Sequence, residues 1–478
     1  MAPATAIKHL VVLYDENVSF DHYFGTYPRA TNPPSYPAFH AAPGTPAVNG
    51  LTPALLNHNP NADNPRPLGR SELVVCDNNH SYTGEQQAFD HRAMDRFVQT
   101  LGPHGSGCNP ATVMDYYNGN TVTALWNYAQ RFAMSDNSYD ATFGPTLLGH
   151  LNLVAGQTRG DVAQPRSSAF KRMTISTNLA AAYEDCAPRS LPRATVVGRN
   201  VGDLLSRAGV TWGWFSAGFR PTARRSDGTA VCGSAHRNRA GKLEPDYSTS
   251  AIAEPFQFWK STANPHHLAP VSVAEVGHDG RANHQYDLAD FWAAADAGHL
   301  PAVSFIKPAG YENGHAGTSD PLLEQRFLVE TINRLQRLPD WSSTAIVIAY
   351  DDSDGWYDHQ AAAISNPSHD PAIDALNGAG RCGTGRPLDG VSGRCGPGPR
   401  QPLLVISPYA KRNYVDHTLT TQVSILRFIE DNWLGGERIG GGSFDATAAG
   451  LDGMLDTTHP DLKRLILNPA SGEPTGAS

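Results

Sequence analysis

Short runs of hydrophobic residues, each about as long as a buried strand, recur along the chain. The two clearest are Leu10 to Tyr14 and Ala345 to Tyr350, and acidic residues follow both directly. Further runs cover Thr211 to Phe215, Ala302 to Ile306 and Leu403 to Ile406. Runs of this length without polar alternation predict strands that are buried on both faces.

Segments with helical periodicity lie between these runs. Leu322 to Leu338 carries apolar residues at Leu328, Ile332 and Leu335, and Gly202 to Ala208 leads through a glycine into the next strand. Helices that alternate with strands predict an α/β fold around a mostly parallel sheet. In such sheets ligands bind beyond the carboxyl ends of the strands, which is where the acidic residues fall.

The chain is long enough for a large core, with 478 residues of which 40% are hydrophobic and 17% charged. No short repeat or clear linker divides it, so we expect a single domain over 1–478. The stretch 28–70 is rich in Pro, Asn and Ala, and 365–400 is rich in Gly, Pro and Arg, so both are expected to be insertions. The tail 468–478 is expected to be disordered.

Charge and hydropathy exclude two classes of partner. The formal net charge is -9 and the sequence shows no dense Lys/Arg stripe, so a nucleic-acid partner is not expected. No apolar stretch approaches the roughly 20 residues that span a bilayer, so integral membrane association is not expected either.

The chain has six cysteines, in neither a CxxC nor a zinc-finger spacing. The simplest disulfide pairing joins sequence neighbours, although six cysteines allow about fifteen pairings. The neighbouring pairs are Cys76 with Cys108, Cys186 with Cys232, and Cys382 with Cys395. Bonded cysteines would indicate a secreted or periplasmic protein, with Met1 standing where an export signal was removed, whereas free thiols would fit a cytosolic enzyme.

Two strand ends carry candidate metal ligands. Glu16 and Asn17 follow the first run, where carboxylates and amides are either ligands of hard cations or helix caps. Asp351 and Asp352 follow the second run, and adjacent carboxylates repel each other unless a cation or an arginine neutralises them. We therefore expect a metal at Asp351 and Asp352.

Thr146 is a candidate nucleophile. It lies in FGPTLLGHLNLVAGQT, where Gly144-Pro145 predicts a turn and a helix follows that begins near the threonine. A hydroxyl at a helix start faces free backbone N–H groups, which suits attack on an anionic phosphorus centre. The alternative is an ordinary N-cap threonine.

Four of the nineteen histidines lie in polar loops that could reach a common site, namely His80, His266, His267 and His315. The sequence contains no zinc-protease motif, GxSxG elbow, Walker A loop or GxGxxG fingerprint. Zinc-protease, serine-hydrolase, NTPase and dinucleotide-binding functions are therefore disfavoured.

Six segments together resemble one known family, the bacterial phospholipase C and acid phosphatase family. The first is ENVSFDHYFG at 16–25, and the resemblance runs from about residue 7 to 434. The others, in the same order as in the family, are FGPT at 143–146, ANPHHL at 263–268, NGHAGTSDP at 313–321, YDDSDGWYDH at 350–359 and SPYAKRNYVDHT at 407–418.

That family is similar to the alkaline phosphatase superfamily, so the resemblance implies an α/β sandwich with its site at the strand ends. It implies that Glu16, Asn17, Asp351 and Asp352 hold a divalent metal, which also binds the oxygen of the nucleophile Thr146. It implies that His80, His266, His267 and His315 surround the phosphoryl group, with His315 a candidate to protonate the leaving oxygen. The ion is Ca, Mg, Mn, Zn or Fe, because oxygen ligands favour the first three and superfamily relatives use the last two.

The resemblance leaves the substrate open between small phosphate esters and phospholipid headgroups. Val18 stands where many phospholipases have Arg, and Asp352-Ser353-Asp354 where they have Glu-His-Gly, which favours an acid phosphatase. Thr146 is instead typical of the phospholipases. A sulfatase is disfavoured because Thr146 lacks the Cys/Ser-x-Pro-x-Arg context, and the alternative from another class is a secreted metal-binding or adhesion protein without turnover.

Overall fold

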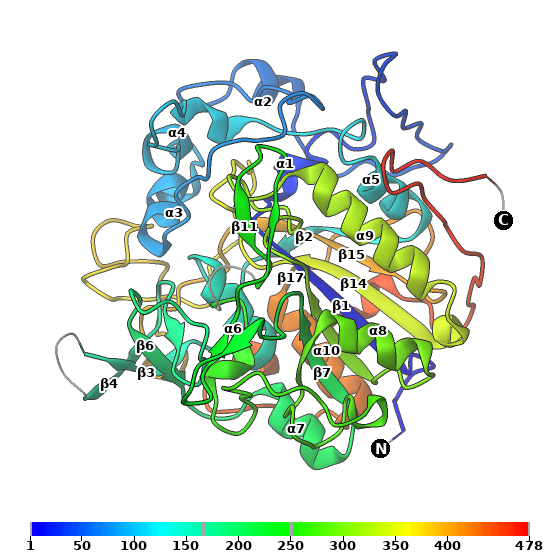
Figure 1. Cartoon of the computed structure of the whole chain (residues 1–478). Coiled ribbons are helices and arrows are strands. Elements are labelled where there is room, and N and C mark those ends of the chain that lie inside the picture. The colour runs from blue at the N-terminus through cyan, green and yellow to red at the C-terminus, as the bar shows by residue number, and fades with distance from the viewer. Residues whose placement is uncertain (1, 165–168, 248–251, 477–478) are drawn as a thin grey trace.

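The computed structural model of the protein describes residues 2–164, 169–247 and 252–476. A nine-stranded sheet forms its centre, in the order β12-β7-β13-β1-β14-β15-β2-β16, with β17 also paired to β2 (Figure 1). Its strands are β1 His9–Asp15, β2 Ala133–Tyr139, β7 Trp212–Ser216, β12 Gln285–Asp287, β13 Val303–Lys307, β14 Thr344–Tyr350, β15 Arg400–Ile406, β16 Tyr414–Asp416 and β17 Thr420–Thr421.

All five strands predicted from apolar runs are present in this sheet, and it is mostly parallel as expected. β12, β7, β13, β1 and β14 run parallel to one another. β15 is antiparallel to both β14 and β2, whereas β16 and β17 are parallel to β2. The predicted mixed α/β fold with a large central sheet is confirmed.

Helices cover both faces of the sheet. The α-helices of the described ranges are α1 Phe20–Phe24, α2 Pro53–Asn57, α3 Tyr82–Phe89, α4 Phe97–Thr100, α5 Thr123–Arg131, α6 Thr146–Ala155, α7 Val201–Ala208, α8 Leu288–Asp296, α9 Pro321–Leu335 and α10 Gln422–Trp433. The predicted helix at 322–338 is α9, which ends three residues early. Pro339 explains the early end, because a proline disfavours helical backbone at the preceding residue.

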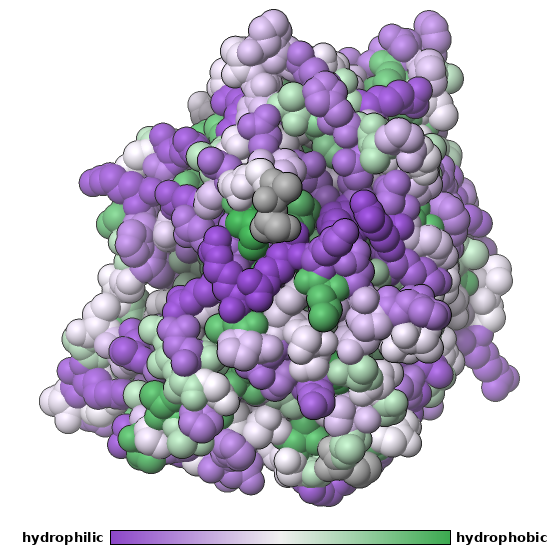
Figure 2. Space-filling model, turned by 90° about the vertical axis from the view of Figure 1, so that its right-hand side faces the viewer, coloured by the Kyte–Doolittle hydropathy of each residue, from purple (hydrophilic) through white to green (hydrophobic). Residues whose placement is uncertain are grey.

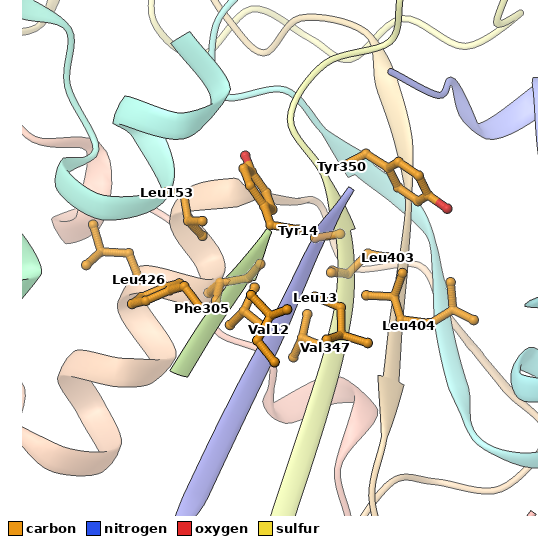
Figure 3. Close-up of a cluster of buried hydrophobic side chains, with 14 of the residues drawn as sticks. Val12, Leu13, Tyr14, Leu153, Phe305, Val347, Tyr350, Leu403, Leu404 and Leu426 are labelled. Carbon is orange, nitrogen blue, oxygen red and sulfur yellow. The ribbon is translucent and has the colours of Figure 1, made fainter. Parts of the chain in front are cut away.

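Tyr14 and Tyr350 show how the two faces are covered. Tyr14 pairs with Ala349 in the register of β1 and β14, so Tyr14 and Tyr350 point to opposite sides of the sheet (Figure 3). Tyr14 packs edge-on against His150 of α6, whereas the Tyr350 hydroxyl donates to Glu324 of α9 at 2.6 Å. Helix α6 therefore covers one face and α9 the other.

One large hydrophobic cluster joins residues from Ile7 to Leu467. Within it, Leu153 of α6 and Leu426 of α10 pack toward the central strands (Figure 3). A second, small cluster joins Ala180, Ala187, Phe219 and Tyr247.

Three small sheets lie outside the central one. The first joins β3 Arg159–Ala163, β4 Phe170–Thr174, β5 Ala180–Ala181 and β6 Arg193–Val196. The others are the hairpins of β8 Ala223–Arg224 with β9 Ala230–Val231, and of β10 Ala235–Arg237 with β11 Leu243–Pro245. On the face shown in Figure 2, hydrophilic residues predominate and hydrophobic ones occur in small groups. None of the helices in the described ranges is both long and apolar enough to cross a membrane.

The three disulfides join sequence neighbours, as predicted: Cys76 with Cys108, Cys186 with Cys232, and Cys382 with Cys395. The Cys382–Cys395 disulfide closes a loop within the segment 365–400. This segment also contacts the core, because the Tyr82 hydroxyl donates to the buried Asp374. The segment 28–70 holds one short helix, α2.

The described part of the tail, 468–476, was expected to be disordered but makes hydrogen bonds within itself and to α5. Asn468 and Gly472 close a turn, because the amide of Gly472 donates to the carbonyl of Asn468. The Asn127 side chain donates to the carbonyl of Gly472 at 2.9 Å. One hydrogen bond within the backbone and one from a side chain of α5 therefore hold this segment.

Candidate active site

The site lies beyond the carboxyl ends of β1, β13 and β14, which are adjacent in the sheet. β1 leads into Glu16 and Asn17, β14 into Asp351 and Asp352, and β13 ends at Lys307. The four predicted ligands are fully buried, and Lys307 is 1% exposed. Parallel strands bring their ends to one edge, so five polar residues from three distant segments meet in the interior.

Thr146 is the first residue of α6, as its sequence context predicted. Pro145 precedes it as N-cap, and Gly156 ends the helix in the left-handed conformation that favours glycine. The Thr146 hydroxyl donates to Oδ2 of Asp352 at 3.2 Å. The predicted nucleophile and a predicted metal ligand are therefore in direct contact.

Gly149 allows α6 to approach the end of β14. A Cβ at this position would lie 1.9 Å from the carbonyl oxygen of Asp351. This distance is far below a van der Waals contact, so only glycine fits here. The close approach places Thr146, one turn earlier, beside the carboxylates.

The carboxylates of Asp351 and Asp352 are held by backbone groups. Oδ1 of Asp351 accepts from the N–H groups of Asn17 at 3.2 Å and Asp352 at 2.9 Å. Oδ1 of Asp352 accepts from the Asp354 N–H at 2.7 Å. Burial, followed by the charge of Asp352, raises the pKa of Asp351 well above its usual range.

Lys307 is a site residue that the sequence interpretation missed. Its ammonium lies 3.0 Å from Oε1 of Glu16. Burial raises the pKa of Glu16, but the charges of Lys307, His315 and His150 outweigh burial and bring that pKa to about 2. The sequence contained a signal for this residue: Lys307 ends an apolar strand, at the same point where acidic residues follow the apolar runs of β1 and β14.

His150 was missed too, although it lies four residues after Thr146 on the predicted helix. Its Nδ1 is 2.8 Å from the Thr146 carbonyl and 3.6 Å from Oδ2 of Asp351. Burial and the Lys307 charge lower the pKa of His150 to about 3. The helical spacing of i and i+4 was the signal that could have identified it.

His80 and His315 lie together, as predicted, with ring centroids 6.2 Å apart. Nδ1 of His80 is 3.5 Å from Asp354, and that of His315 donates to the carbonyl of Ala316 at 2.6 Å. Burial raises the pKa of Asp352, whereas the charges of His80 and His315 lower it. Both histidines therefore act electrostatically on the carboxylate that contacts Thr146.

The structure places His266 and His267 in a different cluster. His266 is exposed and contacts Asp185 at 2.9 Å. His267 is buried between Glu184, 2.6 Å from its Nε2, and the carbonyl of Phe219, 2.6 Å from its Nδ1. The loop 263–268 packs near the Cys186–Cys232 disulfide, and the arrangement of four histidines around one phosphoryl group stays a prediction.

The predicted ligand set fits a divalent cation. It offers oxygen donors from Glu16, Asn17, Asp351, Asp352 and Thr146, and among the described residues Oδ2 of Asp351 and Oδ1 of Asn17 accept no hydrogen bond. A buried carboxylate oxygen without a donor is costly unless a cation binds it.

Ligand atoms of His, Cys and Asp also converge within 4.8 Å at three places in the described ranges: Asp77 with His315 and Asp354, Asp21 with Asp358 and His359, and Cys186 with Cys232 and His267. The second place is already neutralised, because Arg400 contacts Asp21 and Asp358 at 3.1 Å each. The third is closed by its disulfide.

Buried carboxylates, a lysine and a threonine beyond the carboxyl ends of parallel strands define an α/β protein with a polar ligand-binding site at these strand ends. The chain belongs to the phosphoesterase family, because the model of that family matches residues 7–434. It is a phosphoric ester hydrolase, which removes the alternative of an adhesion protein without turnover.

Curated relatives carry phospholipase C names. Phospholipase C A of Mycobacterium tuberculosis is 24% identical over 442 residues, covering 88% of this chain and 72% of the relative. Non-hemolytic phospholipase C of Burkholderia pseudomallei is 27% identical, covering 89% of this chain and 55% of the relative. Non-specific phospholipase C6 of Arabidopsis thaliana is 23% identical, covering 86% and 63%.

Solved structures similar to the chain include murine ectonucleotide pyrophosphatase/phosphodiesterase 5, with a TM-score of 0.35 and 10% identity over 70% of this chain and 95% of that one. A mutant of the alkaline phosphatase PafA has a TM-score of 0.32 and 10% identity over 80% and 98%.

Proposed function

We propose that the chain hydrolyses phosphoesters through a covalent phosphothreonine on Thr146, with a divalent metal at Glu16, Asn17, Asp351 and Asp352. The observation that carries the proposal is the contact between Thr146 and Asp352 at the start of a buried helix. A bound ion would lower the pKa of the Thr146 hydroxyl and neutralise charge on the phosphoryl oxygens.

The residues of the chain supply the remaining steps. The hydrogen bond to Asp352 holds the Thr146 oxygen in one orientation. The Thr146 hydroxyl passes its proton to Asp352 as its oxygen attacks phosphorus. The attack forms the phosphothreonine and breaks the bond to the ester oxygen, which takes a proton from His80 or His315. Water then attacks the phosphothreonine and gives a proton to the same histidine, while the threonine oxygen takes its proton back from Asp352 and inorganic phosphate is released.

Trapping the intermediate tests this mechanism. Acid quenching after brief exposure to p-nitrophenyl phosphate should leave a phosphate group on the peptide that contains Thr146, measurable by mass spectrometry. A phosphorylated histidine in place of the threonine would contradict the assignment, because His80 and His315 would then be nucleophiles.

We propose phosphomonoesters as the preferred substrates, which makes the chain an acid phosphatase. Lys307, His80 and His315 lie around the carboxylates, and these donors suit the higher negative charge of a monoester. The phospholipase C names of the relatives support the alternative, hydrolysis of diester lipid headgroups.

Comparing kcat/KM for p-nitrophenyl phosphate and p-nitrophenyl phosphorylcholine from about pH 4 to about pH 9 separates the two substrate classes. We expect the monoester to be preferred, with its best rate below neutral pH. A preference for the choline diester of more than about tenfold at every pH would instead define a phospholipase C.

We also propose that the protein works outside the cytosol, in a secreted or periplasmic location. The three disulfides support this proposal, because they persist in oxidising compartments. Alkylation of native protein should label no cysteine, and labelling at both Cys382 and Cys395 would contradict the proposal.

A further inference from the structure

A second group of metal-binding side chains lies next to the proposed metal site. Asp77, His315 and Asp354 bring one ligand atom each within 4.8 Å of one another. They come from the Cys76–Cys108 loop, the loop before α9 and the turn after β14. The Asp77 side chain is 57% exposed, whereas Asp354 is fully buried, so the group opens to solvent on one side only.

Asp354 is held in an unusual position. Its φ is 53°, in the left-handed region that favours glycine, and its carboxylate is nevertheless buried. Asn17 donates to Oδ1 at 3.2 Å, and the side chain of Asn78 donates to Oδ2 at 3.3 Å. Two neutral amides orient this carboxylate without neutralising its charge.

The side chain of Asn78 gives independent support for a ligand here. Asn78 is 4% exposed, and its Oδ1 has no hydrogen-bond partner among the described residues. Since the nitrogen of the same amide binds Asp354, the oxygen lies beside the same group. A buried amide oxygen without a donor is a natural ligand for a cation.

The carboxylates of Asp77 and Asp354 repel each other at this separation unless a positive charge lies between them. His80 is one candidate, since its Nδ1 is 3.5 Å from Asp354 and 4.0 Å from Asp77. However, that nitrogen is closer to the carbonyl of Asn78, at 2.9 Å. His80 is therefore oriented by the backbone first, and its ring lies at 3.5 and 4.0 Å from the two carboxylates rather than in hydrogen-bond contact with either.

We infer that Asp77, His315 and Asp354 form a second divalent-cation site beside the one at Asp351 and Asp352. His315 would bind through Nε2, because its Nδ1 donates to the carbonyl of Ala316. One imidazole with two carboxylates suits Zn²⁺ or Mn²⁺ better than Mg²⁺ or Ca²⁺. The inference goes beyond the proposed function and does not depend on the role of Thr146.

Asn17 links the two sites. Its backbone N–H donates to Asp351 and its side-chain amide donates to Asp354. A carboxylate of each site therefore accepts a hydrogen bond from the same residue. In two-metal hydrolases the second ion stabilises the leaving oxygen. With His315 bound to that ion, His80 remains to donate the proton to the leaving group.

Metal counting on the full chain tests the inference. Purified protein is stripped with a chelator and titrated separately with ZnCl2 and MnCl2, and bound ions are measured by elemental analysis and calorimetry. We expect two ions per chain with at least one of these metals. Asp354→Gly should keep one, and glycine suits the backbone at φ 53°, so this variant should fold.

Three further variants complete the test. Asp77→Asn, at an exposed position, should lower the affinity for one of the two ions by about tenfold or more. The exposed control Asp63→Asn should bind both ions with the affinity of the parent. Asp352→Asn should instead reduce binding at the other site. One ion in the parent with both metals, or two ions of unchanged affinity in both Asp354→Gly and Asp77→Asn, would overturn the inference. Trapped phosphothreonine with a single bound ion would support the proposed function and contradict the second site. Two bound ions without phosphothreonine would support the second site and contradict the proposed function.

Discussion

The Thr146 hydroxyl donates to Oδ2 of Asp352 at 3.2 Å, although the two residues are 206 positions apart in the chain. The contact exists because α6 starts at Thr146 and Asp352 follows the end of β14. It joins a potential nucleophile to an acidic strand end, and the following predictions begin from it.

Thr146→Ala should lower kcat for p-nitrophenyl phosphate by about a thousandfold or more, because it removes the oxygen that forms the covalent bond. Thr146→Ser is the matched control, since it keeps the hydroxyl and should retain activity within about tenfold. Far-UV circular dichroism and the unfolding midpoint should be unchanged in both. An alanine variant with activity within about tenfold of the parent would contradict the assignment.

Asp351→Asn and Asp352→Asn should each lower metal content together with kcat. Both side chains are fully buried, and Oδ2 of Asp351 has no hydrogen-bond donor among the described residues, so loss of charge weakens cation binding directly. Elemental analysis after dialysis measures the effect, with the exposed Asp63→Asn as control. Full metal occupancy in both variants would place the ligands elsewhere.

Gly149→Ala should impair both stability and activity. The added Cβ would lie 1.9 Å from the carbonyl oxygen of Asp351, and a backbone atom cannot rotate away. We expect a loss of about 1–3 kcal/mol in the free energy of unfolding, typical of overpacking, and a lower kcat because Thr146 moves with α6. Gly105→Ala, in an exposed loop, is the control: its Cβ would lie 3.1 Å from Sγ of Cys108 and far less close to the backbone, so in denaturant and rate measurements it should lower stability less than Gly149→Ala and leave kcat unchanged. A stable, fully active Gly149→Ala protein would show that α6 is not fixed by this contact.

His267 should make stability depend on pH. Burial lowers its pKa, but the charge of Glu184 and hydrogen bonds to Glu184 and the Phe219 carbonyl outweigh burial, so the pKa is raised. A raised pKa in the folded state gives a contribution that is complete below the unfolded value of about 6.5 and is lost as pH rises through the folded value.

The free energy of unfolding measured from about pH 5.5 to about pH 9 should therefore fall with pH in the parent. The fall should be smaller in His267→Gln, which cannot gain the charge. His266→Gln, at the exposed neighbouring position, should follow the parent. Equal slopes in the parent and His267→Gln would show that folding does not shift the pKa of His267.

The sequence by itself determined the central elements of the fold. Runs such as Ala345 to Tyr350 lack polar alternation, because β14 has neighbours on both sides and helices on both faces. Burial therefore dictates the residue types, and the strand can be recognised without its partners. The same holds for Glu16, Asp351 and Thr146, whose positions follow from strand ends and a helix start.

Only the tertiary structure decided which distant loops meet. His266 and His267 resemble His80 and His315 in local composition, yet the first pair packs near the Cys186–Cys232 disulfide and the second lies beside Asp354. Lys307 gains its role from the parallel pairing of β13 with β1, which sets its ammonium against Glu16. Loop sequences carry no periodic signal of burial, and strand order is set by packing among all the elements, so neither can be deduced from one segment at a time.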